Sequence, residues 1–284
     1  MSQSQSHSPP STSASHAKQR VILVGIGGAT CSGKTTLAKH LARLLPNSFI
    51  IHQDDFAPPA GRVPLHPKLG IQDWDAPRGA IDWARLVAFL RGVKATGRIP
   101  EEHRSHDHLN KQKEIPVGAG VGRWRGTFEA AAARAEEEVV WGLVDGFLLY
   151  WHPDVVAQLD VRVFLRVPHD VLRQRRHERH GYHTADGSLW RDPPHYWEDI
   201  VYPAYVQASA GLFVGGDVEH GNVAAPSPDP PSDYAGEWQG EGESGGARPV
   251  PGLLLIEAAE MGMDAMVECV CAVLIREVGG AGMQ

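Results

Sequence analysis

A glycine-rich loop between an apolar strand and a helix constrains this chain more than any other feature. The strand is expected over Arg20–Ile26, and leucines at helical spacing follow the loop over about residues 33–45. Glycines let such a loop point backbone N–H groups inward, and the N-terminus of the next helix adds its dipole. The pattern predicts a site for the phosphates of a nucleoside triphosphate rather than a glycine-rich turn with nothing bound. The loop residues expected to form the site are Gly28, Ala29, Thr30, Cys31, Ser32, Gly33, Lys34, Thr35 and Thr36.

Two side chains of this loop carry specific chemistry. Lys34 supplies a mobile positive charge for the β- and γ-phosphates. The hydroxyl of Thr35 is an oxygen ligand that suits Mg²⁺. The loop is therefore expected to bind a nucleotide together with a magnesium ion.

Composition argues against several classes of protein. A net charge of −7 gives no positive field that would attract nucleic acid, so a general nucleic-acid binder is not expected. No apolar run reaches the roughly 20 residues that span a bilayer, so no membrane partner is expected. Cysteine occurs 3 times, too rarely for a disulfide framework, which favours a reducing, cytoplasmic location. The expected partner is a small molecule, and the sequence does not fix the oligomeric state.

Short apolar segments alternate with helical patterns along the chain. This alternation predicts an α/β fold of the P-loop type, in which helices flank a parallel β-sheet and ligands bind beyond the carboxyl ends of the strands. The expected strands are 20–26, 48–52, 139–144, 161–167 and 253–256. Helices are expected over 33–45, 81–90 and 130–138, from 168, and over 194–210 and 261–277.

The chain is expected to form one domain over residues 18–284, behind a disordered tail over 1–17. Two polar segments interrupt the domain, at about 94–126 and 215–248. The first is expected to be a surface insertion with little core, and the second a disordered loop. The first also contains clustered histidines, which favour a solvated loop over a metal site because no cysteines lie nearby. These are His103, His106 and His108.

Acidic residues follow two of the expected strands. Asp54 and Asp55 come after the second strand, where a carboxylate can accept the proton of a hydroxyl that attacks the γ-phosphate. A turn or helix cap uses the same residue type, and position alone leaves both interpretations open. Asp145 ends a buried strand opposite the loop, where such enzymes hold Mg²⁺, although a strand-ending turn would also use Asp. The expected magnesium ligands are Thr35, Asp54 and Asp145.

The helix that begins after the fourth strand is strongly basic in an otherwise acidic chain. Residues three and four apart are neighbours on a helix, so Arg179 lies beside Arg175 and Arg176. Such a cluster repels itself unless an anion is present. We therefore favour a mobile lid over the γ-phosphate, with a hinge in 181–187, over a solvated face paired with acidic neighbours.

One aromatic residue beside a carboxylate suggests a ligand contact. Trp74 could stack on an aromatic base while Asp75 binds a hydroxyl or a cationic ring. A partly buried tryptophan that anchors a loop would give the same pattern. The residues alone leave both interpretations open.

Several segments resemble the nicotinamide riboside kinases. They are the loop up to Lys39, Gln53-Asp-Asp-Phe56, Asp145-Gly-Phe-Leu-Leu-Tyr150, the basic helix, and Tyr196–Pro203. The loop is generic, whereas the second and third segments are much more specific. The resemblance implies a P-loop kinase with a helical lid that uses ATP and Mg²⁺. It also implies phosphorylation of the 5′-hydroxyl of nicotinamide riboside, and often of nicotinic acid riboside, to a mononucleotide precursor of NAD.

The same resemblance implies roles for individual residues. Asp54 would be the general base and would bind the substrate, with Asp55 and Phe56 nearby. Trp74 would stack on the pyridine ring, and Asp75 would bind the ribose. In the lid, the residues that would contact ATP are Arg175 and Arg179, and those that would contact the substrate are Arg176 and Tyr182.

This chain departs from the family pattern at three points, and two other functions compete with it. Asp145 stands where the family usually has Glu, Trp74 replaces a Tyr, and the two polar insertions have no counterpart that we identify. A uridine- or cytidine-type kinase, or another small-metabolite kinase of the same fold, would use the same loop. A GTP-dependent switch would need Asn-Lys-x-Asp, and the Asn-Lys at residues 110–111 lacks that Asp.

Overall fold

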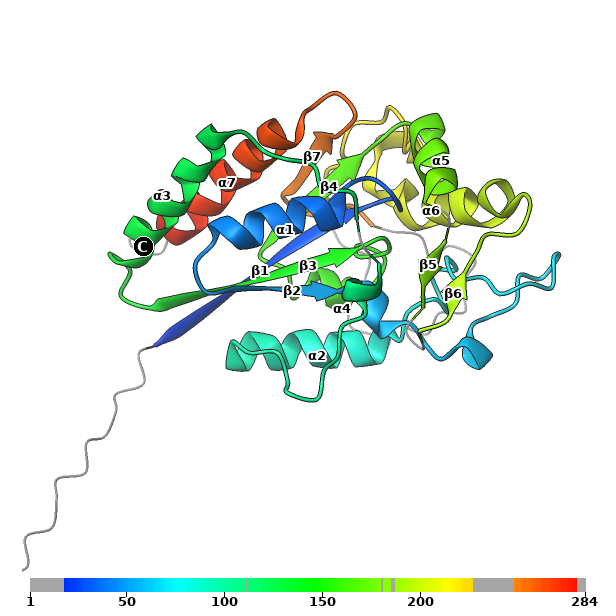
Figure 1. Ribbon diagram of the computed structural model, residues 1–284, viewed down its shortest axis with the longest axis horizontal. Coiled ribbons are helices and arrows are strands. Elements are labelled where there is room, and N and C mark those ends of the chain that lie inside the picture. Colours follow the sequence, from blue (N-terminus) through cyan, green and yellow to red (C-terminus); the bar gives the residue numbers. More distant parts are fainter. Residues whose placement is uncertain (1–17, 111, 180, 185–186, 227–247, 280–284) are drawn as a thin grey trace, which may run out of the picture.

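The computed structural model describes residues 18–110, 112–179, 181–184, 187–226 and 248–279 (Figure 1). The expected tail over 1–17 lies outside the described residues, as does 227–247 of the second expected insertion. Residues 215–226 are described, and Val223 in this segment forms an antiparallel bridge with Phe213.

Five parallel strands form the centre of the fold, as the alternating pattern predicts. Their bounds are β1 Gln19–Gly28, β2 Ser48–His52, β3 Glu138–Gly146, β4 Val161–Arg166 and β7 Leu253–Glu257. The order is β2-β3-β1-β4-β7, so the strand before the glycine-rich loop lies in the middle. In the register of the sheet, Asp145 pairs with Ile26 on one side and with His52 on the other. The loop, His52 and Asp145 therefore meet at one edge.

Helices cover both faces of the sheet (Figure 1). Their bounds are α1 Lys34–Leu44, α2 Trp83–Thr96, α3 Arg123–Ala132, α4 Pro153–Val156, α5 His169–Glu178, α6 Tyr202–Ser209 and α7 Met263–Gly279. Helices α1, α3 and α7 pack together on one face, while α2 contacts β1 and α4 on the other. Helices α5 and α6 lie toward the end of the sheet at which the strands point.

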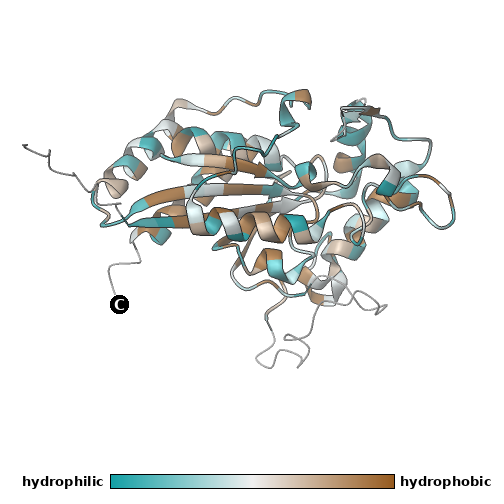
Figure 2. Cartoon of the chain, turned by 90° about the horizontal axis from the view of Figure 1, so that it is seen from below, coloured by the Kyte–Doolittle hydropathy of each residue, from teal (hydrophilic) through white to brown (hydrophobic). Residues whose placement is uncertain are grey.

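The hydrophobic core follows the central strand. Ile22, Leu23, Val24 and Ile26 of β1 are at most 1% exposed. Figure 2 shows the hydrophobic residues along the sheet and on the helix sides that face it, with polar residues on the outer surfaces. This burial stabilises a rigid frame, from whose edge the functional loops project.

One helix lies earlier in the chain than the sequence pattern predicts. A helix was expected over 130–138, but α3 ends at Ala132 and Glu138 already belongs to β3. The physical reason is the pair Trp124 and Phe128, which lie four apart on one helix face; Phe128 is buried against Trp141. These two aromatic side chains offer far more apolar area than the alanines after them.

Candidate active site

A cavity of about 800 Å³ opens at the carboxyl edge of the sheet. Its walls come from the glycine-rich loop, the segment after β2, the end of β3, and α5 with the chain that follows it. It brings together most of the residues expected from the sequence, namely Thr30, Cys31, Ser32, Gly33, Lys34, Thr35, Thr36, Asp54, Asp55, Trp74, Asp75, Asp145, Arg175, Arg176, Arg179 and Tyr182.

The backbone of the loop takes conformations that suit glycine. Gly28 has a φ of +134°, and a Cβ there would lie 2.4 Å from the carbonyl oxygen of Leu165. Gly33 caps the N-terminus of α1 with a φ of +101°. Lys34 is buried, and its Nζ donates to the carbonyl of Ala29 over 2.7 Å. Burial lowers the pKa of Lys34, and the Asp145 and Asp54 carboxylates oppose that shift.

Asp145 sits in a network at the end of β3. The hydroxyl of Thr35 donates to Asp145 Oδ2 over 2.5 Å, and His52 Nδ1 lies 3.2 Å from the same oxygen. Burial raises the pKa of Asp145, but the His52 hydrogen bond and the Lys34 charge outweigh burial and hold it below its ordinary value. Two oxygen atoms that could ligate Mg²⁺ are thus adjacent. His52 was not expected from the sequence, although its place at the end of β2, beside Asp54, could have indicated it.

The side chains of the segment after β2 point in different directions. Gln53–Phe56 forms a single 3₁₀ turn, so consecutive side chains diverge. Asp54 faces the cavity and is exposed to it, while protein surrounds it on the other sides. Burial by that protein, followed by repulsion from Asp145, raises the pKa of Asp54. A carboxylate with a raised pKa is a stronger base.

Asp55 and Phe56 are placed differently: Asp55 lines the cavity, whereas Phe56 does not. The Asp55 carboxylate lies at the cavity wall but is only 2% exposed, and it accepts from the backbone N–H of His106 over 2.9 Å. Phe56 is buried in the core, where its ring packs against Phe89 and Arg85 lies over it. The 3₁₀ turn accounts for both placements, because it directs these side chains away from Asp54.

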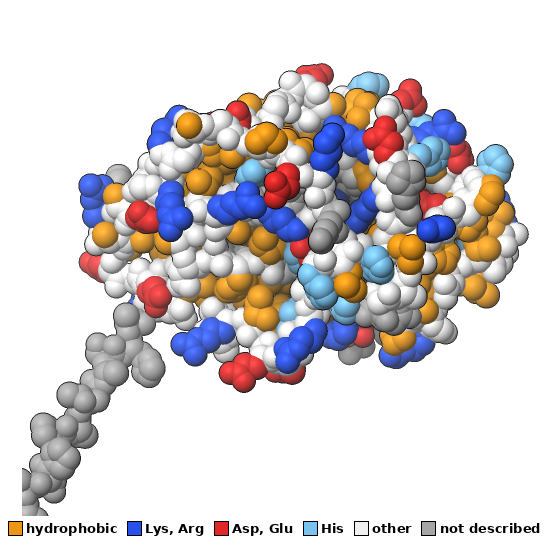
Figure 3. Space-filling model, viewed as in Figure 1, with side chains coloured by type: hydrophobic (Ala, Val, Ile, Leu, Met, Phe, Trp, Pro, Cys, Tyr) orange, Lys and Arg blue, Asp and Glu red, His pale blue; other side chains and the backbone are white. Residues whose placement is uncertain are grey.

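The polar segment around the histidines borders the cavity, and none of its described residues between 101 and 117 is buried. We call residues 101–110 and 112–117 the strap. Asp107 pairs with Lys39 of α1 at 2.6 Å, and the carbonyl of Ile115 lies 2.8 Å from His40 Nε2. Figure 3 shows histidine side chains gathered on this face, between α1 and the segment after α5. The strap therefore lies at the surface with little core, and its contacts come from elements distant in sequence.

We call α5 and the hairpin that follows it the lid. The hairpin pairs β5 (Tyr182–His183) with β6 (Leu189–Trp190). In α5, Arg175 Nη1 donates to the carbonyl of Cys31 over 3.2 Å, and Arg179 lies over the ring of Tyr182. The arginines therefore gather over the loop, as the spacing on the helix predicts.

Arg176 connects the lid to both sides of the cavity. Its Nη1 donates to Thr30 Oγ1 over 3.2 Å, and its Nη2 donates to the Tyr182 hydroxyl over 3.1 Å. Asp192, which the sequence analysis did not identify, forms a bidentate ion pair with it. Asp75 lies 3.9 Å from Arg176 Nη2.

Comparisons with known proteins identify the family of this chain. No family model matches the chain. A nicotinamide riboside kinase of Schizosaccharomyces pombe is 36% identical over 202 residues, which is 70% of this chain and 84% of the relative. One of Saccharomyces cerevisiae is 34% identical over 71% of this chain and 82% of its own. The chain belongs to the nicotinamide riboside kinases.

Less similar proteins also match the chain. The human nicotinamide riboside kinase 2 is 30% identical over 184 residues, which is 65% of this chain and 66% of the relative. An unliganded sugar kinase of Janibacter sp. HTCC2649 aligns over 89% of this chain and 94% of its own, with 14% identity and a TM-score of 0.43. At that similarity it informs neither the fold nor the site.

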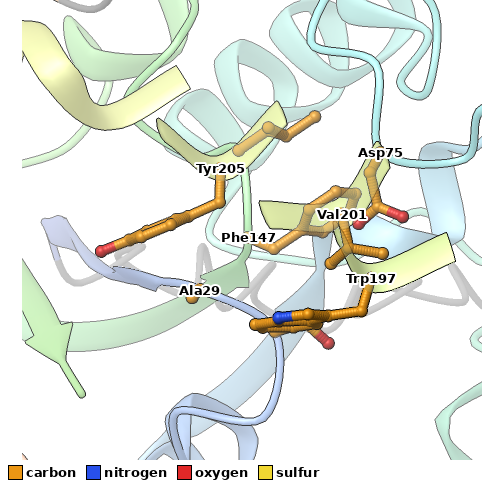
Figure 4. Close-up of a pocket in the computed structure, with 8 residues that line it drawn as sticks. Ala29, Asp75, Phe147, Trp197, Val201 and Tyr205 are labelled. Atoms are coloured by element: carbon orange, nitrogen blue, oxygen red, sulfur yellow. The ribbon is translucent and has the colours of Figure 1, made fainter. Parts of the chain in front are cut away.

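A second, small cavity shares three wall residues with the large one, namely Thr30, Asp75 and Phe147. It measures about 10 Å³, which is room for about one water molecule. Figure 4 shows Asp75 at its edge, with Phe147, Trp197 and Tyr205 among the walls. Burial in these surroundings raises the pKa of Asp75 to about 6, and Arg176 only partly offsets the shift.

Two negative findings concern the described residues of this kinase. Within them, no helix combines the length and the apolar character that crossing a bilayer requires. The same residues hold no cluster of three or more His, Cys, Asp or Glu side chains arranged as a metal site. A kinase magnesium ion needs no such cluster, because substrate phosphates and water complete its shell.

Proposed function

We propose that this protein transfers the γ-phosphoryl group of ATP to the 5′-hydroxyl of nicotinamide riboside and so makes a mononucleotide precursor of NAD. The observation that carries the proposal is a single cavity, in a chain of this family, that holds Lys34 and Asp54 together. The cavity is large enough for the reacting ends of two substrates. Within it, Lys34 would supply a cation and Asp54 a base, one on each side of the transfer.

The loop side would bind ATP. The backbone N–H groups after Gly28, the start of α1 and the ammonium of Lys34 form a positive concave surface. Thr35 and Asp145 offer oxygen atoms suited to Mg²⁺, which when bound would neutralise charge on the phosphates. Arg175 would add positive charge from the lid.

The opposite side would bind the riboside. Asp54 faces the cavity with a raised pKa and would accept the proton of the 5′-hydroxyl. Trp74 and Asp75 are adjacent on the same wall, where the indole could stack on a pyridinium ring and the carboxylate could bind the ribose. Arg176 and Tyr182 would close this side from the lid, and Arg179 would face the nucleotide.

Several finer points belong to the same proposal. Nicotinic acid riboside is a second candidate substrate, and a uridine- or cytidine-type specificity is the alternative. One domain over residues 18–284 and a cytoplasmic location, as expected from composition, complete the proposal.

Turnover on four nucleosides tests the proposal. ADP release from ATP and Mg²⁺ is measured with nicotinamide riboside, nicotinic acid riboside, uridine and cytidine at equal concentrations. We expect strong turnover on nicotinamide riboside and weak or no turnover on the two pyrimidine nucleosides. Preferred turnover of uridine or cytidine, or turnover of none of the four, would overturn the substrate assignment.

A further inference from the structure

The guanidinium of Arg176 is held almost entirely by the protein itself. Its Nε donates to Asp192 Oδ2 over 2.7 Å, and its Nη2 donates to Asp192 Oδ1 over 3.0 Å. Its Nη1 reaches Thr30, as described above. The side chain is only 5% exposed, so this bidentate pair lies mostly out of water. Paired charges of this kind are geometrically specific.

Asp192 also fixes the aromatic side of the lid. Its Oδ1 accepts from Trp190 Nε1 over 3.0 Å. The Trp190 ring packs edge-on against Trp74, with ring centres 6.0 Å apart. One carboxylate thus holds two lid side chains beside the Trp74–Asp75 wall, Arg176 and Trp190.

A second carboxylate competes for the same cation. Asp75 Oδ2 is buried, has no hydrogen-bond partner among the described residues, and lies 3.9 Å from Arg176 Nη2. That separation is beyond hydrogen-bond distance, whereas the contacts to Asp192 are well within it. Without Asp192, the nearest carboxylate to the Arg176 guanidinium is that of Asp75.

We propose that Asp192 is a positioning residue for the kinase reaction: it holds Arg176 away from Asp75 and so leaves the Asp75 carboxylate free for the acceptor substrate. This inference rests on the proposed function, in which Asp75 binds the riboside. Asp192 then acts without touching the substrate itself. Removing its charge should transfer Arg176 to Asp75 and block the acceptor side while leaving the ATP side intact.

The test compares Asp192→Asn, Asp192→Glu and the matched control Asp199→Asn, an exposed Asp on the same segment. For Asp192→Asn we expect KM for the riboside to rise about tenfold or more, with KM for ATP changed less than about twofold. Asp192→Glu should restore much of the loss, and Asp199→Asn should behave like the wild type. Equal changes in both KM values, or none, would overturn the proposal.

A pH profile separates positioning from a merely structural role. The charged groups around Asp75 are Arg176, Asp192, Asp73 and Asp54, with the phenols of Tyr182 and Tyr196. Losing the Asp192 charge and gaining the Arg176 contact both favour ionised Asp75. The acidic limb of kcat/KM for the riboside should therefore move about one pH unit lower in Asp192→Asn. An unchanged acidic limb would contradict the proposal.

A substrate-free measurement keeps the two proposals distinguishable. The titration of the Asp75 carboxyl is followed by carbon-13 NMR in the wild type and in Asp192→Asn, with Asp75→Asn to assign the signal. A lower midpoint in Asp192→Asn supports the positioning role, and an equal midpoint overturns it. Failure of the wild type to phosphorylate any riboside would overturn the proposed function alone.

Discussion

The phosphate side of the cavity is held by the backbone of the sheet, whereas the acceptor side is held by side chains from distant segments. The loop over 28–36 leaves the central strand directly, and Asp145 ends the strand beside it. The strap and the lid are instead joined by individual hydrogen bonds and ion pairs. Rigid elements of a sheet lose little entropy on binding, while side-chain contacts can be exchanged one at a time. The backbone of the proposed ATP side is therefore preformed, whereas the contacts of the proposed acceptor side are adjustable.

The largest effect should come from the base between the two sides. Asp54→Asn keeps the shape of the side chain but removes its ability to accept a proton. We expect turnover to fall about 10²- to 10⁴-fold, with ATP affinity nearly unchanged. Initial rates and nucleotide titration measure the two quantities. Turnover close to that of the wild type would exclude Asp54 as the general base.

The next largest effect tests whether backbone alone fixes the phosphate side. A Cβ at Gly28 would lie 2.4 Å from a backbone oxygen of β4, and its φ of +134° strains any other residue. Gly28→Ala should lower the free energy of unfolding by about 2–4 kcal/mol and abolish ATP binding. Gly61→Ala is the matched control, because open space surrounds that position. Urea unfolding compares the two, and equal stability would contradict the clash.

On the acceptor side, one substitution should separate stability from function. The raised pKa of Asp75, about 6, means that the folded state binds the proton more tightly than the unfolded chain, whose ordinary value is 3.8. Ionised Asp75 therefore destabilises the fold above pH 6, and this cost disappears as the pH falls toward 4. At about 1.4 kcal/mol per pH unit, the full cost is at most about 3 kcal/mol.

Asp75→Asn should accordingly raise the free energy of unfolding at pH 7 while lowering affinity for the riboside. The gain should shrink as the pH falls from 6 to 4. Thermal unfolding across this pH range measures it. A variant that is less stable than the wild type at pH 7 would show that the ionised carboxylate contributes a favourable contact instead.

The smallest effect concerns the link between strap and lid. Asn110 Nδ2 donates to the carbonyl of His183 over 2.9 Å, and Asn110 Oδ1 accepts from the His183 N–H over 2.8 Å. Asn110→Ala should cost about 1 kcal/mol and raise KM for the riboside severalfold, without changing KM for ATP. Exposed Asn222 provides the control as Asn222→Ala. Amide hydrogen exchange in the hairpin should be faster only in Asn110→Ala. Equal exchange rates in the two variants would show that the Asn110–His183 contact does not hold the strap to the lid.

The same contrast explains what sequence could predict. The loop, the parallel α/β sheet and Asp145 all follow from local patterns, because a strand end fixes where its next residue lies. The positions of Asp55 and Phe56 could not be predicted, since a single 3₁₀ turn decides which side chain faces the cavity. The contacts of Asp192 and His106 were equally hidden, because their partners are Arg176 and Asp55, in segments whose approach no local pattern encodes.

Two cationic side chains of the phosphate side are hydrogen-bonded to carbonyl groups of the loop. Lys34 Nζ donates to the carbonyl of Ala29, and Arg175 Nη1 donates to that of Cys31. In the proposed ATP complex, phosphate oxygens would replace these carbonyl oxygens. This replacement would follow the first encounter as an internal step, whose rate does not depend on nucleotide concentration. In a rapid-mixing experiment the observed rate constant for ATP binding should then rise with ATP concentration and level off. At high ATP, the internal rearrangement of the protein would limit the rate of ATP binding.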